Sequence, residues 1–444
     1  MKKLLSILLA LTLSAALCGG LCSFAKTGDA DGDGTLSIRD VTTLLLYLAN
    51  EDVPVVVSEE NLDVNGDTTI SVSDVTALLL LLSDAVIPSV DLEYDEEIDL
   101  SSLTDGQVVT LTTGGTYLVT GTAANAQIKM NNKSEAFNLL LCDASITFLG
   151  EGAAIQADKC DECTITMVAG TENYIADSSD NAEDAALQVK GGDLKLKGAG
   201  KLTINSKTEG IYNTKDLKID GPTVDVTSKD HGVVVKKTIT VKSGSLTVNA
   251  KGDGLKAKGD VEDDDVTHAV GTGVVTIEGG NVNITATKDG FDCEEGVILT
   301  GGTVTVDAKG DGIKAVEYIE ISGGVQTVYA SEDGIKTTGG ALNITGGDIY
   351  VEATGDGINA ETDLTVTGTP VIDVTTGGGH TVVADPAVSC VGFKALGALV
   401  IEGGDLTIDS AMYCYYGASV AVSVTPASAQ FGSGYALTYV VPAV

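Results

Sequence analysis

The chain has 444 residues, of which 43% are hydrophobic, and its formal net charge at pH 7 is −37. This charge makes nucleic acid a poor partner, because binding to phosphates depends on Lys and Arg, and the hydrophobic content excludes a disordered acidic tail. After the N-terminal apolar run Leu4–Leu17, no stretch has the roughly 18 apolar residues of a membrane-spanning helix.

Residues 1–25 have the pattern of a secretory signal peptide. Lys2 and Lys3 precede the apolar run, and Ser23-Phe24-Ala25 offers a cleavage site with small residues. We therefore expect a secreted protein. Outside the cell, calcium is a natural partner for surplus carboxylates, because it takes many oxygen ligands.

Residues 26–86 contain two copies, 34 residues apart, of an acidic loop followed by an apolar run. Oxygen donors at loop positions 1, 3, 5, 7, 9 and 12 are what an EF-hand-type loop offers calcium. We expect the two apolar runs to form helices that bury against each other once metal fixes the loops. The predicted calcium ligands of the two loops are Asp29, Asp31, Asp33, Thr35, Asp40, Asp63, Asn65, Asp67, Thr69 and Asp74.

The duplicated loop and helix resembles a type I dockerin, the all-α module that docks onto cohesin modules of a cellulosome scaffold. The resemblance implies that loop positions 10 and 11, which are Ile38, Arg39, Val72 and Ser73, help to choose the cohesin partner. Thr68 departs from the pattern, because the sharp turn at position 6 normally requires Gly. A calcium-stabilised helix pair without a partner is the alternative. Residues 87–100 read as a linker into the main domain.

The second half of the chain repeats one phrase, an acidic or polar residue, then Gly, then an apolar residue. The glycines are spaced by 22, 22, 36, 22, 22, 23 and 35 residues, so two repeats carry insertions. Three short alternating strands and tight turns in 22 residues predict one coil of a parallel β-helix, which we place at residues 101–411. Residues 412–444 depart from the pattern and are expected to form an irregular tail or cap. The apolar residues after each glycine should form one inward column, Ile211, Val233, Leu255, Phe291, Ile313, Ile335, Ile358 and Phe393.

The residue before each glycine forms a second column, which is mostly Asp. Coils stack at about 4.8 Å, so neighbouring carboxylates repel by about 1 kcal/mol per pair in water and more where water is excluded. Either lysine or calcium must offset this. A ladder of Asp and Lys side chains explains Asp333 and Asp356. Near Asp253 this explanation is weaker, because an acidic insertion follows it and position 292 is acidic where neighbouring coils have lysine. Few lysines are then left nearby to balance the carboxylates. The predicted calcium ligands here are Asp253, Glu262, Asp263, Asp264, Asp289, Asp292 and Asp311.

The order GDGLKAKGDVEDDD, a return strand, then GG and KDGFD resembles the β-helical carbohydrate-binding domains of secreted and cellulosomal proteins. The resemblance spans roughly residues 100 to 410. It implies a right-handed parallel β-helix, close in architecture to pectate lyases, that binds calcium and either cellulose or acidic pectic sugars. The chain would then be a cellulosome-associated, calcium-dependent, non-catalytic binder of plant cell-wall polysaccharide.

Two other functions stay open. A pectate lyase would need calcium and a base, and since the β-helix contains no Arg, the base would be Lys256, Lys314 or Lys336. The third class is a structural or adhesive surface protein. For the binder, the expected carbohydrate-binding residues are the same three lysines and Tyr350. Because the chain has no Trp for sugar stacking, the candidate platforms are Tyr212, Tyr318, Tyr329 and Tyr350. Finally, Cys160 and Cys163 form a CxxC that we expect to be two buried small hydrophobes rather than a disulfide.

Overall fold

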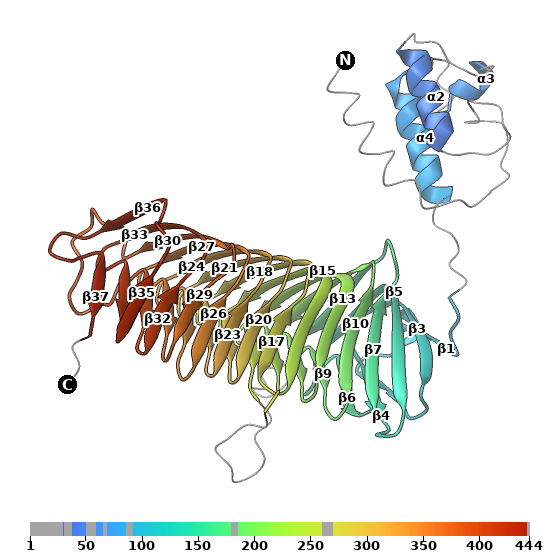
Figure 1. The fold of residues 1–444 in the computed structure, drawn as a ribbon. Helices are drawn as coiled ribbons and strands as arrows, with labels where there is room; N and C mark the ends of the chain where they lie inside the picture. Colours follow the sequence, from blue (N-terminus) through green and yellow to red (C-terminus); the bar gives the residue numbers. More distant parts are fainter. Residues whose placement is uncertain are drawn as a thin grey trace. The chain divides into compact units, whose positions relative to one another are not determined.

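The computed structural model of the chain describes residues 30, 38–49, 59–64, 69–85, 92–178, 185–259 and 270–441. The chain divides into two compact units, Met1–Leu92 and Glu93–Val444 (Figure 1). The predicted signal peptide lies outside the described residues, and among the helices of the described residues none has the length and hydropathy needed to cross a bilayer.

The first unit is helical where it is described. Helices α2 (Ile38–Leu48) and α4 (Val72–Ala85) bury residues spaced three apart, Val41 and Leu44 on α2 and Val75 and Leu78 on α4. Such spacing puts both residues of a pair on one helix face. Together with Leu62 of the short helix α3 (Glu59–Leu62) they form one hydrophobic core, as the sequence predicted for the two apolar runs.

The second unit is a parallel β-solenoid, so the predicted fold class is confirmed. Each coil contributes one short strand to a narrow sheet, in which neighbouring described strands pair in parallel (Figure 1). Within the described residues this sheet has 14 strands in the order of the chain. They are β2 (Gln107–Leu111), β4 (Ala126–Asn131), β6 (Ile155–Lys159), β9 (Leu187–Val189), β12 (Ile211–Asn213), β14 (Val233–Val235), β16 (Leu255–Ala257), β19 (Phe291–Cys293), β22 (Ile313–Ala315), β25 (Ile335–Thr337), β28 (Ile358–Ala360), β31 (Phe393–Ala395), β34 (Tyr415–Gly417) and β37 (Thr438–Val440).

The other two faces of the solenoid join into one wide sheet, because a few long strands run through the corner between them. Counted over the same described residues, the wide sheet has 23 strands. They are β1 (Glu96–Asp99), β3 (Gly115–Ala123), β5 (Ala136–Phe148), β7 (Glu162–Met167), β8 (Glu172–Asp177), β10 (Asp193–Gly198), β11 (Lys201–Ser206), β13 (Leu217–Ser228), β15 (Thr238–Ala250), β17 (Val274–Ile277), β18 (Asn281–Ala286), β20 (Gly296–Leu299), β21 (Thr303–Ala308), β23 (Tyr318–Ile321), β24 (Val325–Ala330), β26 (Ala341–Ile344), β27 (Asp348–Ala353), β29 (Leu364–Val366), β30 (Val371–Thr376), β32 (Ala398–Ile401), β33 (Asp405–Ser410), β35 (Ser419–Val422) and β36 (Ser428–Phe431).

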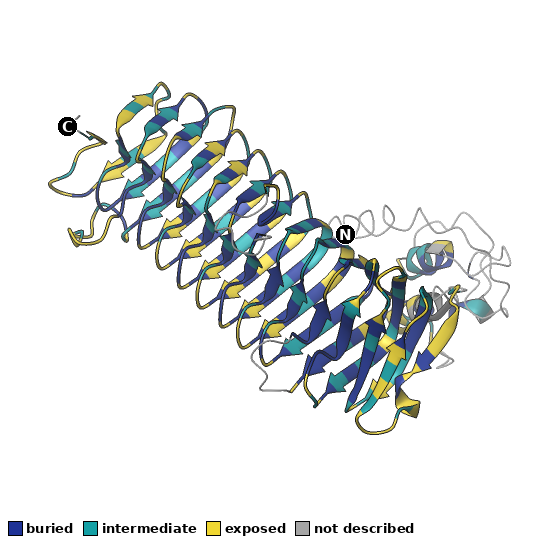
Figure 2. Cartoon of the chain, turned by 90° about the horizontal axis from the view of Figure 1, so that it is seen from below, coloured by how far each residue is buried: buried dark blue, intermediate teal, exposed yellow. Residues whose placement is uncertain are grey.

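Alternation of apolar and polar residues fixes which face of each strand is buried. In β21, for example, Val304 and Val306 are buried while Thr303 and Asp307 are exposed, and Figure 2 shows the same alternation from coil to coil. Side chains in a strand point to opposite faces with a period of two, so the Val, Ile and Leu positions meet inside the solenoid. The predicted inward column is confirmed, since all eight of its residues have no exposed surface.

The repeated glycine is required by close packing between coils. A Cβ atom at Gly312 would lie 2.2 Å from Cγ1 of Val328 and 2.5 Å from the carbonyl oxygen of Gly334 in the next coil. Both separations are far shorter than normal contacts, so any side chain would push the coils apart. A second set of glycines is required for a different reason. Gly302 and Gly324 lie in the turns directly before β21 and β24, and their φ angles of 74° and 81° favour glycine.

The two insertions predicted from the glycine spacing leave the stack in register. Leu255 pairs with Phe291 across the first insertion, and Ile358 pairs with Phe393 across the second. Since both pairs belong to the inward column, the additional residues do not shift the register of the strands.

Two boundaries differ from the sequence-based expectation. The segment 87–100 was expected to be a linker, but β1 at Glu96–Asp99 already pairs with β3 and so begins the solenoid. Residues 412–444 were expected to be irregular, but β34 and β35 pair with the preceding coil and β37 pairs with β34. Backbone hydrogen bonds alone can add a further coil to the solenoid. The sequence analysis missed this coil because it lacks the glycine phrase.

Candidate functional site

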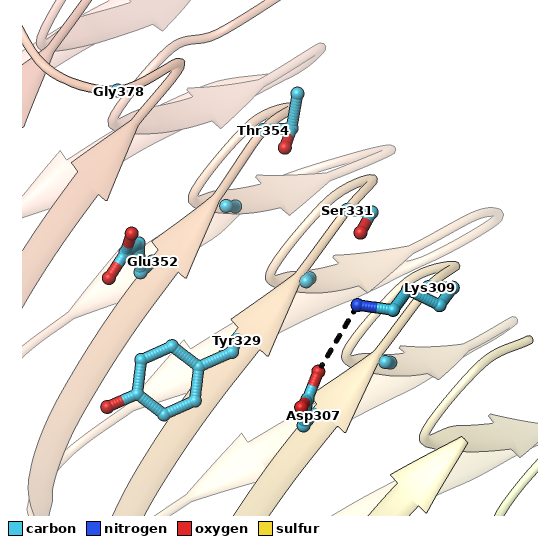
Figure 3. Close-up of a pocket in the computed structure, with 10 residues that line it drawn as sticks. Asp307, Lys309, Tyr329, Ser331, Glu352, Thr354 and Gly378 are labelled. Atoms are coloured by element: carbon cyan, nitrogen blue, oxygen red, sulfur yellow. Dashed lines mark ion pairs between the residues drawn. The ribbon is translucent and has the colours of Figure 1, made fainter. Parts of the chain in front are cut away.

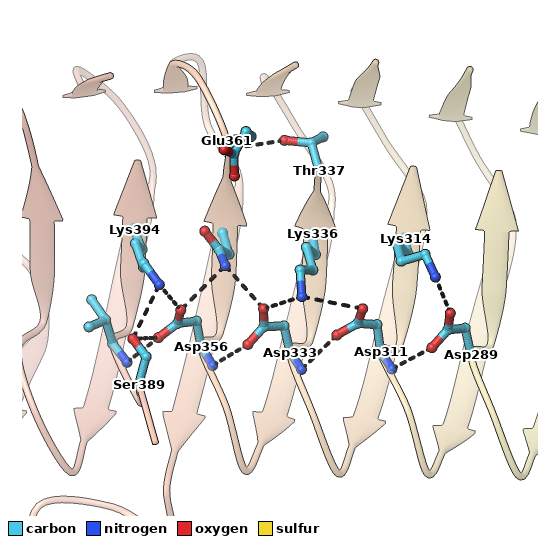
Figure 4. A network of polar contacts seen from close by, with 12 residues as sticks. Asp289, Asp311, Lys314, Asp333, Lys336, Thr337, Asp356, Glu361, Ser389 and Lys394 are labelled. Carbon is cyan, nitrogen blue, oxygen red and sulfur yellow. Dashed lines mark hydrogen bonds and ion pairs between the residues drawn. The ribbon is translucent and has the colours of Figure 1, made fainter. Parts of the chain in front are cut away.

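The predicted aspartate column lies at the corner that leads into the narrow sheet. The carboxylates of Asp289, Asp311 and Asp333 each accept a backbone hydrogen bond from the aspartate of the next coil, and these bonds join the coils along the column (Figure 4). The N–H of Asp311 donates to Asp289 at 2.8 Å, that of Asp333 to Asp311 at 3.0 Å, and that of Asp356 to Asp333 at 2.7 Å. Charged acceptors strengthen such bonds, so the carboxylates take part in the scaffold.

Lysines lie beside the aspartates at the second position of strands β16, β22 and β25. Lys336 lies 3.0 Å from Asp333 and 3.5 Å from Asp311, so one ammonium group bridges two coils. Lys314 likewise pairs with Asp289 and lies 3.1 Å from Asp292. The Asp–Lys ladder that the sequence suggested for Asp333 is therefore present in the structure.

Asp292 interrupts the lysine row, as its sequence position predicted. In register it lies between Lys256 on β16 and Lys314 on β22. One carboxylate oxygen each from Asp253, Asp289 and Asp292 lies within 4.8 Å of the others. Calcium takes oxygen ligands at 2.3–2.6 Å, so oxygens this close fit within one coordination shell.

The expected shortage of local base is wrong for these three carboxylates. Lys256 lies 2.8 Å from Asp253 and also pairs with Asp292, while Lys314 pairs with both Asp289 and Asp292. The two lysines come from the coils on either side of Asp292, and their side chains are about three-quarters buried. Calcium at this cluster would have to compete with both ammonium groups for the same oxygens.

The charges in the ladder shift several pKa values in opposite directions. Burial opposes ionisation of Asp253, but its contacts with His231 and Lys256 outweigh burial and hold its pKa below the usual value. For Asp311 burial prevails over the attraction of Lys336, and its pKa is raised. Burial would lower the pKa of Lys314, but hydrogen bonding and charge attraction to Asp289 and Asp292 raise it.

The raised pKa of Lys314 predicts a pH dependence of stability. Because the folded pKa exceeds the unfolded value of about 10.4, the stabilisation is complete below that pH and is lost as pH rises through the folded pKa. We expect Lys314→Met to lower the free energy of unfolding by about 2 kcal/mol at pH 8. In urea titrations, the difference from the wild type should shrink above about pH 10.5.

Lys309→Met is the matched control, because Lys309 is largely exposed and lies 3.8 Å from its carboxylate partner, Asp307. Exposed pairs of this kind contribute little. A difference between Lys314→Met and the wild type that does not change between pH 8 and pH 11 would contradict the charge-based account.

Other predicted site residues are separated by the fold or lie outside the described residues. Lys256, Lys314 and Lys336 lie on the narrow sheet, whereas Tyr350 lies on β27 of the wide sheet, so the structure does not bring the predicted carbohydrate-binding residues together. Asp311 contacts Lys336 and is not one of the three clustered carboxylates. Predicted metal ligands outside the described residues are Asp29, Asp31, Asp33, Thr35, Asn65, Asp67, Glu262, Asp263 and Asp264.

Three members of the ladder were missed from the sequence. The amide of Asn359 donates to Asp333 at 3.0 Å and to Asp356 at 3.3 Å, so it takes the place of a lysine in the row. Beyond it, Lys394 lies 2.6 Å from Asp356, and the hydroxyl of Ser389 donates to the same carboxylate at 2.6 Å. Asn359 and Lys394 stand two residues after their glycines, as the other lysines do, and this spacing would have found them.

In the helical unit, the last ligand position of each predicted calcium loop is buried. Asp40 and Asp74 have no exposed surface. Asp74 accepts the N–H of Ser71 at 2.8 Å and that of Val64 at 2.9 Å, and the Ser71 hydroxyl oxygen accepts the N–H of Ser73. The Asp74 carboxylate and the Ser71 hydroxyl therefore cap backbone N–H groups at the start of α4, and the bond to Val64 ties this start to the segment after α3.

The predicted partner-binding residues are at the starts of the two long helices. Arg39, Val72 and Ser73 are exposed, and 68% of the Val72 surface is accessible. The side chain of Ile38 lies outside what the structure describes. The other described ligand positions, Asp63 and Thr69, lie between α3 and α4.

The cysteines in the described residues are free thiols. Cys160 and Cys163 are buried, as expected for small hydrophobes, and burial raises the pKa of Cys160 to about 11. A thiol that stays protonated at neutral pH is a poor nucleophile and a poor metal ligand. The CxxC therefore belongs to the solenoid core.

Comparisons with known proteins match both units. A family model described as carbohydrate-binding domain-containing protein matches residues 105–306 and 290–425, and the dockerin type I domain model matches residues 27–81. No curated protein matches the chain. Among solved structures, the gadolinium derivative of the polysaccharide lyase-like protein from C. thermocellum is 23% identical and has a TM-score of 0.40. The match covers 56% of this chain and 93% of that one.

Proposed function

This chain belongs to the family of carbohydrate-binding domain-containing proteins and carries an N-terminal dockerin type I domain, and from this premise we propose a non-catalytic binder of plant cell-wall polysaccharide. The dockerin anchors it to a cohesin of a scaffold protein, in a secreted, cell-surface cellulosome. Family membership of the β-solenoid is the observation that carries the binding part of the proposal. The bound sugars are cellulose or acidic pectic chains.

The lysine ladder supports a binding role over a lyase. A general base must be deprotonated near the working pH, so a lysine base needs a pKa lowered toward 7. Burial would lower the pKa of Lys256, Lys314 and Lys336, but carboxylates hydrogen-bonded to each of them raise it above the usual value. Ammonium groups held in this state can attract an anion but do not accept a proton.

Calcium dependence is the finer part of the proposal. Asp253, Asp289 and Asp292 would hold the ion, and their close oxygens fit its preference for carboxylate ligands. Bound calcium would supply positive charge that bridges the protein carboxylates to the carboxylates of a polyuronate chain. Because Lys256 and Lys314 already balance two of the three carboxylate charges, we expect the solenoid to keep its fold without the ion, so that calcium acts on binding rather than on folding.

The test measures binding of the full chain to polygalacturonate by calorimetry, with calcium and with excess EDTA. We expect chelation to weaken binding by about tenfold or more, and Asp292→Asn to weaken it similarly even with calcium present. Asn is tolerated in this row, since Asn359 occupies the equivalent position of another coil. Asp333→Asn, a ladder carboxylate outside the cluster, should keep wild-type affinity.

Equal affinity with and without EDTA would sink the calcium bridge. Formation of unsaturated uronides, detected by their ultraviolet absorbance, would favour the lyase. If the chain binds to neither cellulose, pectin nor xylan, a structural or adhesive function is favoured.

A further inference from the structure

A shallow hollow of about 280 Å³ lies where three neighbouring strands of the wide sheet end. The last two residues of each of the strands β21, β24 and β27 line it, together with the residue that follows each strand. The turn after β30 closes one side (Figure 3). Its lining combines an aromatic ring, carboxylates, an ammonium group and hydroxyls. The lining residues are Asp307, Ala308, Lys309, Tyr329, Ala330, Ser331, Glu352, Ala353, Thr354 and Gly378.

The strand register places three polar or aromatic side chains in one outward row of this hollow. Asp307 pairs with Tyr329, and Tyr329 pairs with Glu352, so consecutive coils present a carboxylate, a phenol ring and a second carboxylate. Neighbouring coils are about 4.8 Å apart. The row is therefore short enough for one sugar unit of a chain to touch all three side chains.

A second tyrosine supports the row from the adjacent position. The rings of Tyr329 and Tyr350 have centroids 5.8 Å apart and are tilted by 59°, an arrangement that aromatic pairs favour. The Tyr350 hydroxyl donates to Glu352 at 3.2 Å. Tyr350 thus contacts both the ring and one carboxylate of the row, while Tyr329 keeps 42% of its surface exposed.

We propose that this hollow is a subsite for an uncharged, hydroxyl-rich sugar unit, such as that of a neutral β-glycan. The proposal rests on the carbohydrate-binding function proposed above and adds a site and a substrate class to it. The exposed ring of Tyr329 contacts the apolar C–H face of the sugar. Asp307 and Glu352 accept hydrogen bonds from sugar hydroxyls, and a charged acceptor makes such bonds stronger than neutral ones.

The charge of the lining selects against an acidic sugar. Among the described residues that line the hollow there are two carboxylates and a single cation, Lys309, which lies 3.8 Å from Asp307. A uronate placed here would meet like charges on both sides of the ring. The clustered carboxylates proposed for calcium are at the corner with the narrow sheet and do not line the hollow. Binding at this subsite is therefore independent of calcium.

The experiment is calorimetry of the full chain in excess EDTA, with cellohexaose and xylohexaose as neutral probes and hexagalacturonate as the acidic probe. We expect the wild type to bind at least one neutral probe and to prefer it to hexagalacturonate. Tyr329→Ala should weaken that binding by about tenfold or more. Tyr329→Phe keeps the ring and should retain affinity within about threefold. Tyr94→Ala, at a tyrosine with 44% exposure before the first strand, should behave as the wild type.

The outcomes separate this subsite from the proposed function. If polygalacturonate binding depends on calcium and Asp292, but Tyr329→Ala leaves neutral binding unchanged, the subsite is wrong and the proposed function survives. If Tyr94→Ala weakens binding as much as Tyr329→Ala, the effect is not local and the subsite is also wrong. If hexagalacturonate binds better than the neutral probes in EDTA, and Tyr329→Ala removes that binding, the assignment of substrate class is overturned.

Discussion

Replacing Gly312 with alanine is expected to lower the free energy of unfolding of the β-solenoid by about 3 kcal/mol or more. The added Cβ would meet Val328 on one side and the Gly334 carbonyl on the other, at 2.2 Å and 2.5 Å. Neither neighbour can move easily, because Val328 is fully buried and the Gly334 carbonyl accepts the N–H of Ile313, a hydrogen bond that links two coils. Urea unfolding followed by circular dichroism in the β-sheet region measures the loss.

Gly339→Ala is the control for this prediction. A Cβ at Gly339 would lie 3.3 Å from the nearest atom, the carbonyl oxygen of Val316, and the residue is exposed. We expect a change within about 1 kcal/mol, in keeping with surface substitutions. Similar losses for the two variants would mean that backbone entropy, not packing between coils, explains the repeated glycine.

Chelation of calcium is expected to unfold the dockerin and to leave the β-solenoid folded. Asp40 and Asp74 are completely buried, and a buried carboxylate without a cation is costly. EDTA should therefore remove most of the helical circular dichroism signal of α2 and α4 and abolish binding to a cohesin. The urea transition of the solenoid should not move, because its carboxylates are paired with lysines and backbone N–H groups.

A point variant isolates the role of the second loop. Asp74→Asn keeps the size of the side chain but weakens it as a calcium ligand, and we expect calcium affinity to fall by about tenfold or more. Thr76→Ala, at an exposed position of α4, should not change it. Full helicity of the chain in EDTA would contradict the metal requirement.

The sequence was sufficient for the fold where local sterics are decisive. Every regular coil repeats a glycine that has no room for a Cβ, and a residue with no exposed surface follows it. The period of the repeat and the inward column could therefore both be predicted from the sequence. The pattern ends at Cys414, which takes the place of the glycine after Gly392. The last coil still docks through backbone hydrogen bonds, such as that from Tyr415 to Leu437, and these leave little trace in side-chain pattern.

The site was harder to predict, because long side chains reach between coils. Counting charges along the chain made Asp292 look unbalanced, yet Lys256 precedes it by 36 residues and Lys314 follows by 22, and both contact it. The hollow beside Tyr329 was missed for a related reason. Its row joins Asp307, Tyr329 and Glu352, which share no motif and meet only through strand register.

Strand register that survives both insertions has an evolutionary consequence. Leu255 with Phe291 and Ile358 with Phe393 stack as their uninterrupted neighbours do, although 14 and 13 further residues separate them. A corner of this solenoid, such as that between β30 and β31, can thus take up additional residues while the neighbouring strands keep their pairing. Selection can vary ligand preference at such corners, and an engineer could graft a recognition loop there, while the scaffold stays constant.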